Sequence, residues 1–417
     1  MSNELPSDLV YNIIASIDDR KAEDELNELN RPPPTLAACS LVSHAWNDIC
    51  RPHVFRTITI DHGVKWHSRL SFLYFTAPHL SKYIRTLRLS WDSEIHTASE
   101  WIPACLKQLE NLDGLYLRSH LVPSAPAVPM PFALGVIALT AHIKRLWLET
   151  WDIVQDASDL LPLLSACSAT LEKLTLRIYA VSHLGTIPQR QDFQSRRSKP
   201  VRLEALRKLE LLEGFDPLPQ MINIECPNLE SLTVELDGGD RWKIPSWIPA
   251  GFHELNLRVA VGIDVPLLQS THLSSLSISI SHIVDHSYHP VITWIGTFLR
   301  DLPFPEHLRQ LTVKIDSYSR GLVRPIYPCL AEYEELYQVL ETLLQYKGIT
   351  RLSLIIAITL VPGLDVCARD EEGEIAKLEK VFLHLLTSGI LAADIVFQRP
   401  SGEVLGRWCI GPRHSVI

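Results

Sequence analysis

Apolar and polar residues alternate in a short pattern that recurs through most of the chain. Ten six-residue stretches have the form apolar-x-x-Leu-x-aliphatic, from IRTLRL at 84–89 to ITRLSL at 349–354. Residues two apart lie on the same face of a β-strand, so both apolar side chains can enter a core while the residue between them faces outward. The pattern therefore predicts ten short strands, centred on Leu87, Leu115, Leu146, Leu174, Leu209, Leu232, Leu255, Leu276, Leu311 and Leu352.

The spacing of these leucines indicates a repeat architecture. The smallest step is 21 residues, from Leu255 to Leu276, and the largest is 41, from Leu311 to Leu352. Such a period resembles the leucine-rich repeat, in which each strand returns through a helix or loop and stacks on its neighbour. The resemblance implies an α/β horseshoe-shaped solenoid of about ten units. That family places Asn or Cys three residues after the last apolar strand position; here none of the ten positions carries either, so we expect an irregular solenoid.

The segments between the predicted strands support this interpretation. The returning segments include ASEWIPACLKQL (98–109), ASDLLPLLSACSAT (157–170) and EELYQVLETLLQY (334–346), and the last of these has its leucines at helical spacing. The short middle units have room only for loops or a single helical turn. The tail at 394–410 alternates apolar and polar residues around PSGE, which predicts a strand pair or an atypical last repeat. We expect a cap at about 390–417, because the last core face would otherwise meet water.

The first sixty residues have a helical period instead. In LPSDLVYNIIASI (5–17) the apolar residues form one stripe, and in TLAACSLVSHAWNDI (35–49) they recur every three or four residues. We predict a helix over each stretch, with Thr35 as the N-cap of the second. The chain then changes to a strand-like pattern in RPHVFRTITI (51–60), which leads into the repeats.

These stretches together resemble an F-box. The family pattern is Leu-Pro-x-Glu/Asp-Leu-x-x-x-Ile-Leu followed by Leu-x-x-Cys-x-x-Val-x-x-x-Trp. Nine residues of this chain fall on it: Leu5, Pro6, Asp8, Leu9, Ile13, Leu36, Cys39, Val42 and Trp46. The sequence CSLVSHAW…RPHVFRTI is especially similar to that of F-box proteins of mushroom-forming fungi, in which leucine-rich repeats commonly follow the F-box. The resemblance implies an F-box at 1–60 and a leucine-rich-repeat substrate-recognition domain at 61–417.

Two features depart from the family. The stretch at 18–34 separates the helices widely and holds six acidic and three basic residues, a net charge of −3. We interpret this charged insert as a solvated loop. In addition, Ser43 and His44 stand where the family often has Cys-Arg. Neither change removes an apolar residue.

The resemblance implies a function in ubiquitin transfer. An F-box docks a Skp1-type adaptor, which links to cullin, so the chain would be the non-catalytic substrate-recognition subunit of an SCF-type cullin–RING E3 ubiquitin ligase. Three short helices bury little surface alone, and an exposed apolar face needs a partner. The expected adaptor-binding residues are Leu5, Pro6, Leu9, Val10, Ile13, Ile14, Leu36, Leu41, Val42 and Trp46.

The outward strand positions predict where a target protein would bind. Arg and aromatic residues gather on the first four units, and these residue types anchor protein interfaces and bind carboxylate or phosphate. We therefore expect contacts with an acidic or phosphorylated segment of a target on the concave face, at Arg88, Tyr116, Arg118, Trp147 and Arg177. The alternative is that these are ordinary solvated strand residues.

Three other functional interpretations stay open. The N-terminal helices could merely cap the first repeat, which would leave a leucine-rich-repeat interaction scaffold that enters no ligase. An RNA-binding or inhibitor-like solenoid is a further alternative, although the net charge of −9 gives no overall attraction to nucleic acid. An enzyme is the most remote, because the P-loop, dinucleotide, zincin and nucleophile-elbow motifs are all absent from the sequence.

Composition indicates an ordinary globular protein without a cofactor. Hydrophobic residues make up 46% and charged residues 21%, and no apolar run is long enough to span a bilayer. The N-terminus lacks a signal-peptide pattern, and the eight cysteines show no C-x-x-C spacing, so we expect reduced thiols and a cytoplasmic or nuclear location. The histidine-rich stretch HIVDHSYH (282–289) is expected to be a polar surface loop rather than a metal site.

Overall fold

The structure is a computed structural model of the chain. It describes residues 7–17, 34–60, 71–91, 108–119, 142–150, 164–178, 200–212, 224–236, 251–260, 272–283, 288–300, 302, 307–318, 330–344, 349–359, 368–387, 390–398 and 404–410. The chain forms two compact units. The first comprises residues 1–207 and 220–227, and the second comprises residues 208–219 and 228–417.

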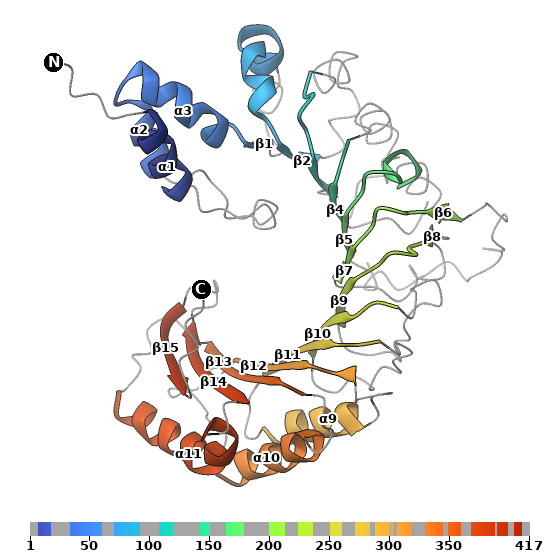
Figure 1. The fold of residues 1–417 in the computed structure, drawn as a ribbon, viewed down its shortest axis with the longest axis vertical. Coiled ribbons are helices and arrows are strands. Elements are labelled where there is room, and N and C mark those ends of the chain that lie inside the picture. Colours follow the sequence, from blue (N-terminus) through green and yellow to red (C-terminus); the bar gives the residue numbers. More distant parts are fainter. Residues whose placement is uncertain are drawn as a thin grey trace, which may run out of the picture. The chain divides into compact units, whose positions relative to one another are not determined.

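The first unit begins with helices and continues as a parallel sheet (Figure 1). Its helices are α1 (Ser7–Ile17), α2 (Pro34–Ser40), α3 (His44–Val54), the π-helical turn η2 (Phe72–Thr76) and the 3₁₀ helix η3 (Pro78–Tyr83). Its sheet runs in the order β1 (Thr57–Ile60), β2 (Thr86–Trp91), β3 (Gly114–Ser119), β4 (Arg145–Thr150), β5 (Lys173–Ile178), all parallel. A small parallel pair joins β6 (Val201–Arg202) to β8 (Ile224–Glu225). Sequence reasoning did not predict this pair.

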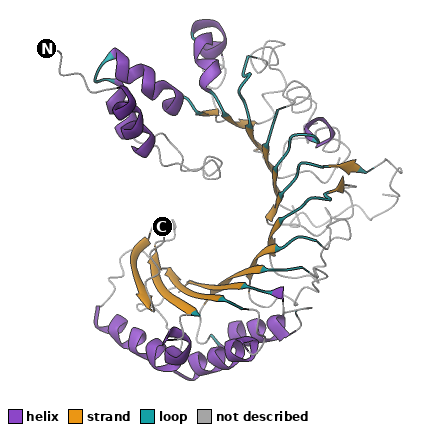
Figure 2. Ribbon diagram, viewed as in Figure 1, coloured by secondary structure: helices purple, strands orange, loops and turns teal. Residues whose placement is uncertain are grey.

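The second unit is a longer sheet with helices between its later strands (Figure 2). Its strands run in the order β7 (Lys208–Leu212), β9 (Ser231–Leu236), β10 (Glu254–Ala260), β11 (Ser275–Ile283), β12 (Gln310–Tyr318), β13 (Arg351–Thr359), β14 (Leu391–Gln398), β15 (Val404–Ile410). All pair in parallel except β15, which is antiparallel to β14. The helices are α9 (His289–Arg300), α10 (Leu330–Leu344) and α11 (Ala368–Thr387).

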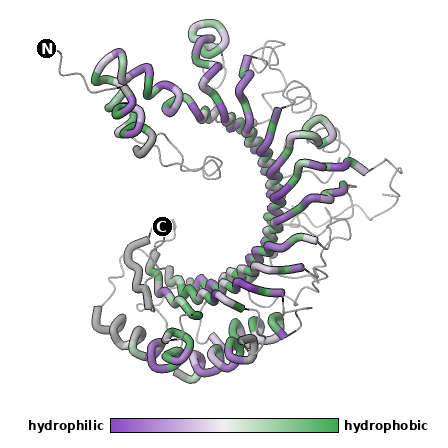
Figure 3. Tube along the Cα trace, viewed as in Figure 1, coloured by the Kyte–Doolittle hydropathy of each residue, from purple (hydrophilic) through white to green (hydrophobic). Residues whose placement is uncertain are grey.

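The ten predicted repeat strands are confirmed, and their leucines form continuous buried rows. Within the first unit Leu87, Leu115, Leu146 and Leu174 are register partners on adjacent strands. In the second unit the row runs from Leu209 through Leu352 and ends at Leu391 on β14. Each of the ten central leucines is at most 2% exposed, because alternate residues of each strand enter the core. Figure 3 shows apolar and polar residues interleaved along these strands.

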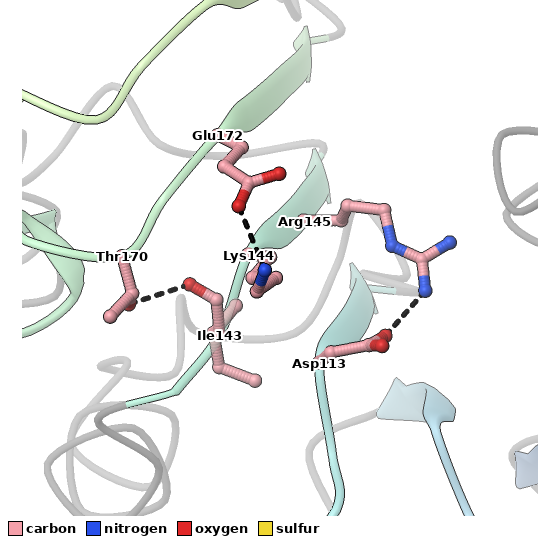
Figure 4. Close-up of polar contacts among 6 residues, drawn as sticks. All are labelled: Asp113, Ile143, Lys144, Arg145, Thr170 and Glu172. Carbon is pink, nitrogen blue, oxygen red and sulfur yellow. Dashed lines mark hydrogen bonds and ion pairs between the residues drawn. The ribbon is translucent and has the colours of Figure 1, made fainter.

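Charged residues just before the strands help to fix the stacking of the first unit. The Asp113 carbonyl accepts hydrogen bonds from the N–H groups of Lys144 and Arg145, and the Lys144 carbonyl accepts from Glu172 in the same way. Side chains of opposite sign then meet across neighbouring repeats: Lys144 Nζ lies 2.9 Å from Glu172 Oε1, and Arg145 pairs with Asp113 (Figure 4). A shift of one repeat relative to the next would separate these charges, so the pairs favour the observed register.

Gly114 is required where Arg145 crosses β3. A Cβ atom at this position would lie 2.9 Å from Thr86 Oγ1 and 3.3 Å from Arg145 Nη2. The guanidinium therefore uses the space above Gly114 and comes within 3.5 Å of Thr86 Oγ1. The absence of a side chain allows a charged group to span three adjacent strands.

The helix and the strand pair predicted in the C-terminal part of the chain agree with the structure. The helix expected at 334–346 is α10, and the strand pair expected at 394–410 is β14 with β15. Only the C-terminal part of the stretch at 157–170 is described, and residues 164–167 are helical there. Most of the stretch at 98–109 and the whole charged insert at 18–33 lie outside the described residues.

The prediction of a surface loop at 282–289 is wrong at both of its ends. The strand β11 continues through His282 to Ile283, and α9 begins at His289. The Nδ1 atom of His289 lies 2.8 Å from Glu335 Oε2 on α10, so this histidine joins two helices. Asp285 and His286 lie outside the described residues.

The prediction of one helix over 35–49 is also wrong, because the chain turns at residues 41–43. The N–H groups of Leu41 and Val42 donate to the carbonyls of Ala38 and Cys39, which closes the end of α2. Ser43 is extended and its Oγ accepts a hydrogen bond from the N–H of Trp46 at 3.3 Å. A serine side chain is a preferred N-cap, so Ser43 starts α3 as a separate helix.

Candidate functional site

The three N-terminal helices pack around a small core of their own. Val10, Ile14, Leu36 and Cys50 are buried at its centre. Cys39, Trp46, Ile49 and Val54 pack partly buried against them. Three residues expected to contact an adaptor, Val10, Ile14 and Leu36, are therefore occupied in holding the helices together.

Other apolar residues of this helical module face solvent. Leu41 is 86% exposed and Val42 is 63% exposed, both in the turn between α2 and α3. Leu9 and Tyr11 on α1 are 46% and 57% exposed. Large apolar side chains exposed to this degree cost free energy in water and are typical of a surface that a partner covers.

The remaining expected adaptor contacts divide between the core and undescribed positions. Ile13 and Trp46 are partly buried, and Trp46 contributes to the core of the helical module. Leu5 and Pro6 lie outside the described residues. Tyr11 was not among the expected residues, although its place in the amphipathic stretch 5–17 could have marked it. Its ring contacts His53 on α3 edge-on, with 6.4 Å between ring centroids.

The five expected target-binding residues come together on the outward face of β2–β5, but two of them are buried. Arg88 is 6% exposed and Tyr116 is 3% exposed. The guanidinium of Arg88 lies over the Tyr116 ring, 4.7 Å from its centroid, and the ring of Trp147 lies 5.3 Å from the Tyr116 ring. Long side chains on strands about 4.8 Å apart cover one another in this way. Trp147, Arg118 and Arg177 are partly exposed.

Glu149 completes this cluster, and sequence reasoning gave it no role. It is 2% exposed and lies on β4 in register with Arg118 on β3 and Arg177 on β5. Its Oε1 lies 3.4 Å from Arg118 Nε, and its Oε2 accepts a hydrogen bond from the Tyr116 hydroxyl. The signal that could have identified it is the strand register, which places one acid between two arginines.

Burial and the hydrogen bond to Glu149 keep the Tyr116 phenol protonated. Burial and then the bond to Glu149 raise the pKa of the Tyr116 phenol well above its usual value. Tyr116 is therefore a neutral donor at any physiological pH, and it satisfies one oxygen of a buried carboxylate. A buried charge needs such partners, because an unsolvated carboxylate is costly.

The outward face of the second unit has a different character. Its strands carry small polar side chains in register, including Asn256, Ser277 and Ser353. Its charges pair locally: Lys314 Nζ lies 2.8 Å from Asp316 Oδ1, and Arg258 lies 3.8 Å from Glu235. The described side chains on this face include no aromatic ring.

Within the described part of the chain, no group of three or more His, Cys, Asp or Glu residues is arranged to hold a metal ion. The described thiols of Cys167 and Cys226 are buried, and burial raises their pKa to about 11 and about 12. Such thiols pack as core residues and are poor nucleophiles. None of the described helices has the length and apolarity that crossing a bilayer requires.

Comparisons with known proteins do not assign the chain to a family. No protein-family model matches the chain, and a search of curated proteins finds no match. A search of solved structures finds the crystal structure of the leucine-rich repeat-containing protein LegL7 from Legionella pneumophila. The two share 12% sequence identity with a TM-score of 0.42, over 86% of this chain and 94% of that chain. Similarity at this level carries no functional argument, and the assignment to a leucine-rich-repeat architecture rests on the strands and register described above.

Proposed function

We propose that this protein is a non-catalytic receptor that links a target protein to an SCF-type ubiquitin ligase. Its N-terminal helices bind a Skp1-type adaptor, and its repeats bind the target. The transfer chemistry belongs to the partner enzymes, and the receptor contributes by holding the target close to the ubiquitin donor.

The observation that carries the adaptor half of this proposal is the turn at Leu41 and Val42. The core of the helical module is complete without these two side chains, since neither belongs to it. They nevertheless stand on a well-defined turn, held by two backbone hydrogen bonds at 3.1 Å and by the Ser43 cap. A rigid turn that presents aliphatic side chains loses little entropy on binding, which favours it as a docking element.

The resemblance of the sequence to an F-box indicates which partner these helices bind, a Skp1-type adaptor. Leu9 and Val42 are pattern residues that the structure leaves exposed, whereas Leu36 is a pattern residue that it buries. A single motif of this kind can both stabilise the helices and bind the adaptor, because some of its positions are buried in the core and others are exposed to the adaptor. A scaffold with no adaptor would have no use for the exposed positions.

The test is binding of the full chain to a purified Skp1-type adaptor, measured by calorimetry and size-exclusion chromatography. We expect a one-to-one complex for the natural chain. Leu41→Asp and Val42→Asp should each weaken it about 30-fold or more, the effect typical of a central interface residue. Because both side chains are solvent-exposed, neither change should alter thermal unfolding.

Phe75→Asp is the matched control. Phe75 is 68% exposed on η2, outside the helical module, so this change adds the same charge to an equally exposed apolar site. It should leave adaptor affinity unchanged. Absence of a complex with the natural chain, or equal binding by the Leu41 and Val42 variants, would leave the chain as an interaction scaffold outside any ligase.

A further inference from the structure

Basic side chains gather on the outward face of the first unit. The described outward positions of β2–β5 hold five basic residues and one acidic residue, Glu149, a net charge of +4. The basic residues are Arg88, Arg118, Arg145, Lys173 and Arg177. The chain as a whole carries −9. The described outward positions of β7–β13 carry four basic and four acidic residues, so the positive face is confined to the first unit.

We propose that the outward face of β3–β5 binds an extended acidic segment of the target protein. Arg118 and Arg177 pair with two carboxylates of that segment, and Trp147 contacts an apolar residue between them. The inference rests on the target-binding half of the proposed function and is independent of the adaptor. Charge complementarity selects an acidic partner, and the partly exposed aromatic ring of Trp147, on the strand between those of the two arginines, selects a peptide.

The strand register gives the spacing of the two acids. Arg118 and Arg177 are both in register with Glu149, so they lie two strands apart on either side of it. Two strand spacings are about 10 Å. A polyproline II segment advances about 3.1 Å per residue with three residues per turn, so acidic side chains three positions apart project from the same side and can meet both arginines. The two residues between them pass over β4, the strand that carries Glu149 and Trp147.

Two features prepare this face for binding. Glu149, itself held by the Tyr116 hydroxyl, forms an ion pair with Arg118, so less side-chain entropy is lost when Arg118 meets a carboxylate. The indole Nε1 of Trp147 is buried and has no hydrogen-bond acceptor in the described part of the structure. A peptide carbonyl that reached this N–H would satisfy a donor whose burial otherwise costs free energy.

A protein segment fits this face better than a nucleic acid does. Three of the five basic side chains lie in or against the buried network: Arg88 over Tyr116, Arg118 beside Glu149, and Arg145 beside Asp113. A nucleic acid needs a continuous basic path along its backbone, which these engaged side chains do not provide. A short peptide with two carboxylates needs only two partly exposed arginines.

The probe is a fluorescein-labelled peptide of four Glu-Leu-Ser repeats, added to the full-length protein and followed by fluorescence anisotropy. Its glutamates are three positions apart and each is followed by an apolar residue. We expect saturable binding that weakens as salt is raised. A peptide of Gln-Leu-Ser repeats should bind at least 10-fold more weakly, and one with the same composition but contiguous glutamates should bind less tightly than the spaced probe.

Variants of the protein locate the site. Arg177→Ala and Arg118→Ala should each weaken the probe at least about 5-fold, the loss of one charge-assisted pair. Because Arg118 contacts the buried Glu149, the thermal unfolding of each variant is also measured. If Arg118→Ala proves unstable, the result for Arg177→Ala alone decides the test. Arg202→Ala is the control, since Arg202 is exposed on β6 in the same unit and pairs only with Glu204 among the contacts described.

The outcomes separate this inference from the proposed function. Leu41→Asp should bind the peptide like the natural chain, and Arg177→Ala should bind the adaptor like the natural chain. Equal affinity for the glutamate and glutamine peptides, or no effect of Arg177→Ala, would overturn the inference even if the adaptor binds. Tighter binding of a labelled twelve-residue oligouridine than of the acidic peptide would overturn it in favour of a nucleic-acid site.

Discussion

Tyr116 on β3 donates its hydroxyl hydrogen to Glu149 on β4, and both side chains are almost completely buried on the outward face of a parallel sheet. Outward positions of a repeat strand are usually exposed, so this contact converts part of a binding face into a structural network. The network keeps Arg118 and Trp147 in fixed positions at its edge.

Replacing Tyr116 with phenylalanine tests how much this contact stabilises the folded protein. The ring and its packing stay, but the buried Glu149 carboxylate loses a donor, so we expect a loss of about 1–3 kcal/mol in the free energy of unfolding. Urea unfolding followed by tyrosine and tryptophan fluorescence measures it. Tyr337→Phe is the matched control, because Tyr337 donates to Glu341 on the exposed surface of α10 and its loss should cost less than about 0.5 kcal/mol. Equal effects of the two changes would show that burial does not strengthen the Tyr116 contact.

Ser43→Ala tests the break between α2 and α3. Removing a side-chain N-cap costs about 0.5–2 kcal/mol, and here it would also loosen the turn that carries Leu41 and Val42. We expect faster proteolysis of residues 34–54 and weaker adaptor binding, each restored by Ser43→Asp, since aspartate caps equally well. If Ser43→Ala and Ser43→Asp behaved alike, the cap would not control the turn.

Leu276→Ala tests the buried leucine row in the second unit. Leu276 is 1% exposed, so truncation should destabilise the unit by about 2–5 kcal/mol through lost contacts and a cavity. The neighbouring Ser277 faces outward on the same strand, and Ser277→Ala should change stability by less than about 0.5 kcal/mol. Thermal unfolding of both variants measures these effects. A greater loss of stability in Ser277→Ala than in Leu276→Ala would contradict the assignment of the buried and outward faces.

Cys167 and Cys226 should resist alkylation in the folded protein. A rise in the pKa of Cys167 from 9.0 to about 11 lowers its thiolate fraction near pH 8 about 100-fold, and the rise to about 12 for Cys226 lowers it about 1,000-fold. Mass spectrometry after timed iodoacetamide treatment should show both residues labelled slowly in buffer and quickly in urea. Rapid labelling in buffer would place these thiols at the surface.

The strands were predictable because their signal is local. An apolar residue at every second position settles which face of a strand is buried, whatever its neighbours are. That is why Leu87 and Leu352, far apart in the chain, follow the same rule and are both buried.

The two errors in helices have a different cause. The spacing of Leu36, Cys39, Val42 and Trp46 continues across the turn at residues 41–43, so periodicity alone could not reveal the break. The serine that makes it can sit within a helix or cap one. At residues 282–289, polar composition concealed a strand end and the start of α9.

The burial of Arg88 and Tyr116 could not be read from the sequence, because it depends on which residues are register partners. Arg88 is buried against Tyr116, and Tyr116 is satisfied by Glu149. Both contacts cross strands, and their residues are about thirty positions apart in the chain. Sequence reasoning named Arg88 and Tyr116 but missed Glu149 and the contacts that bury them.

Hydrogen–deuterium exchange of the full chain with and without a Skp1-type adaptor tests the central claim most directly, because it reports binding and its location together. Our account predicts slower exchange in residues 7–17 and 34–54 when the adaptor is present, with no change in β2–β5. Unchanged exchange in these helices, or protection confined to the repeat strands, would contradict the account.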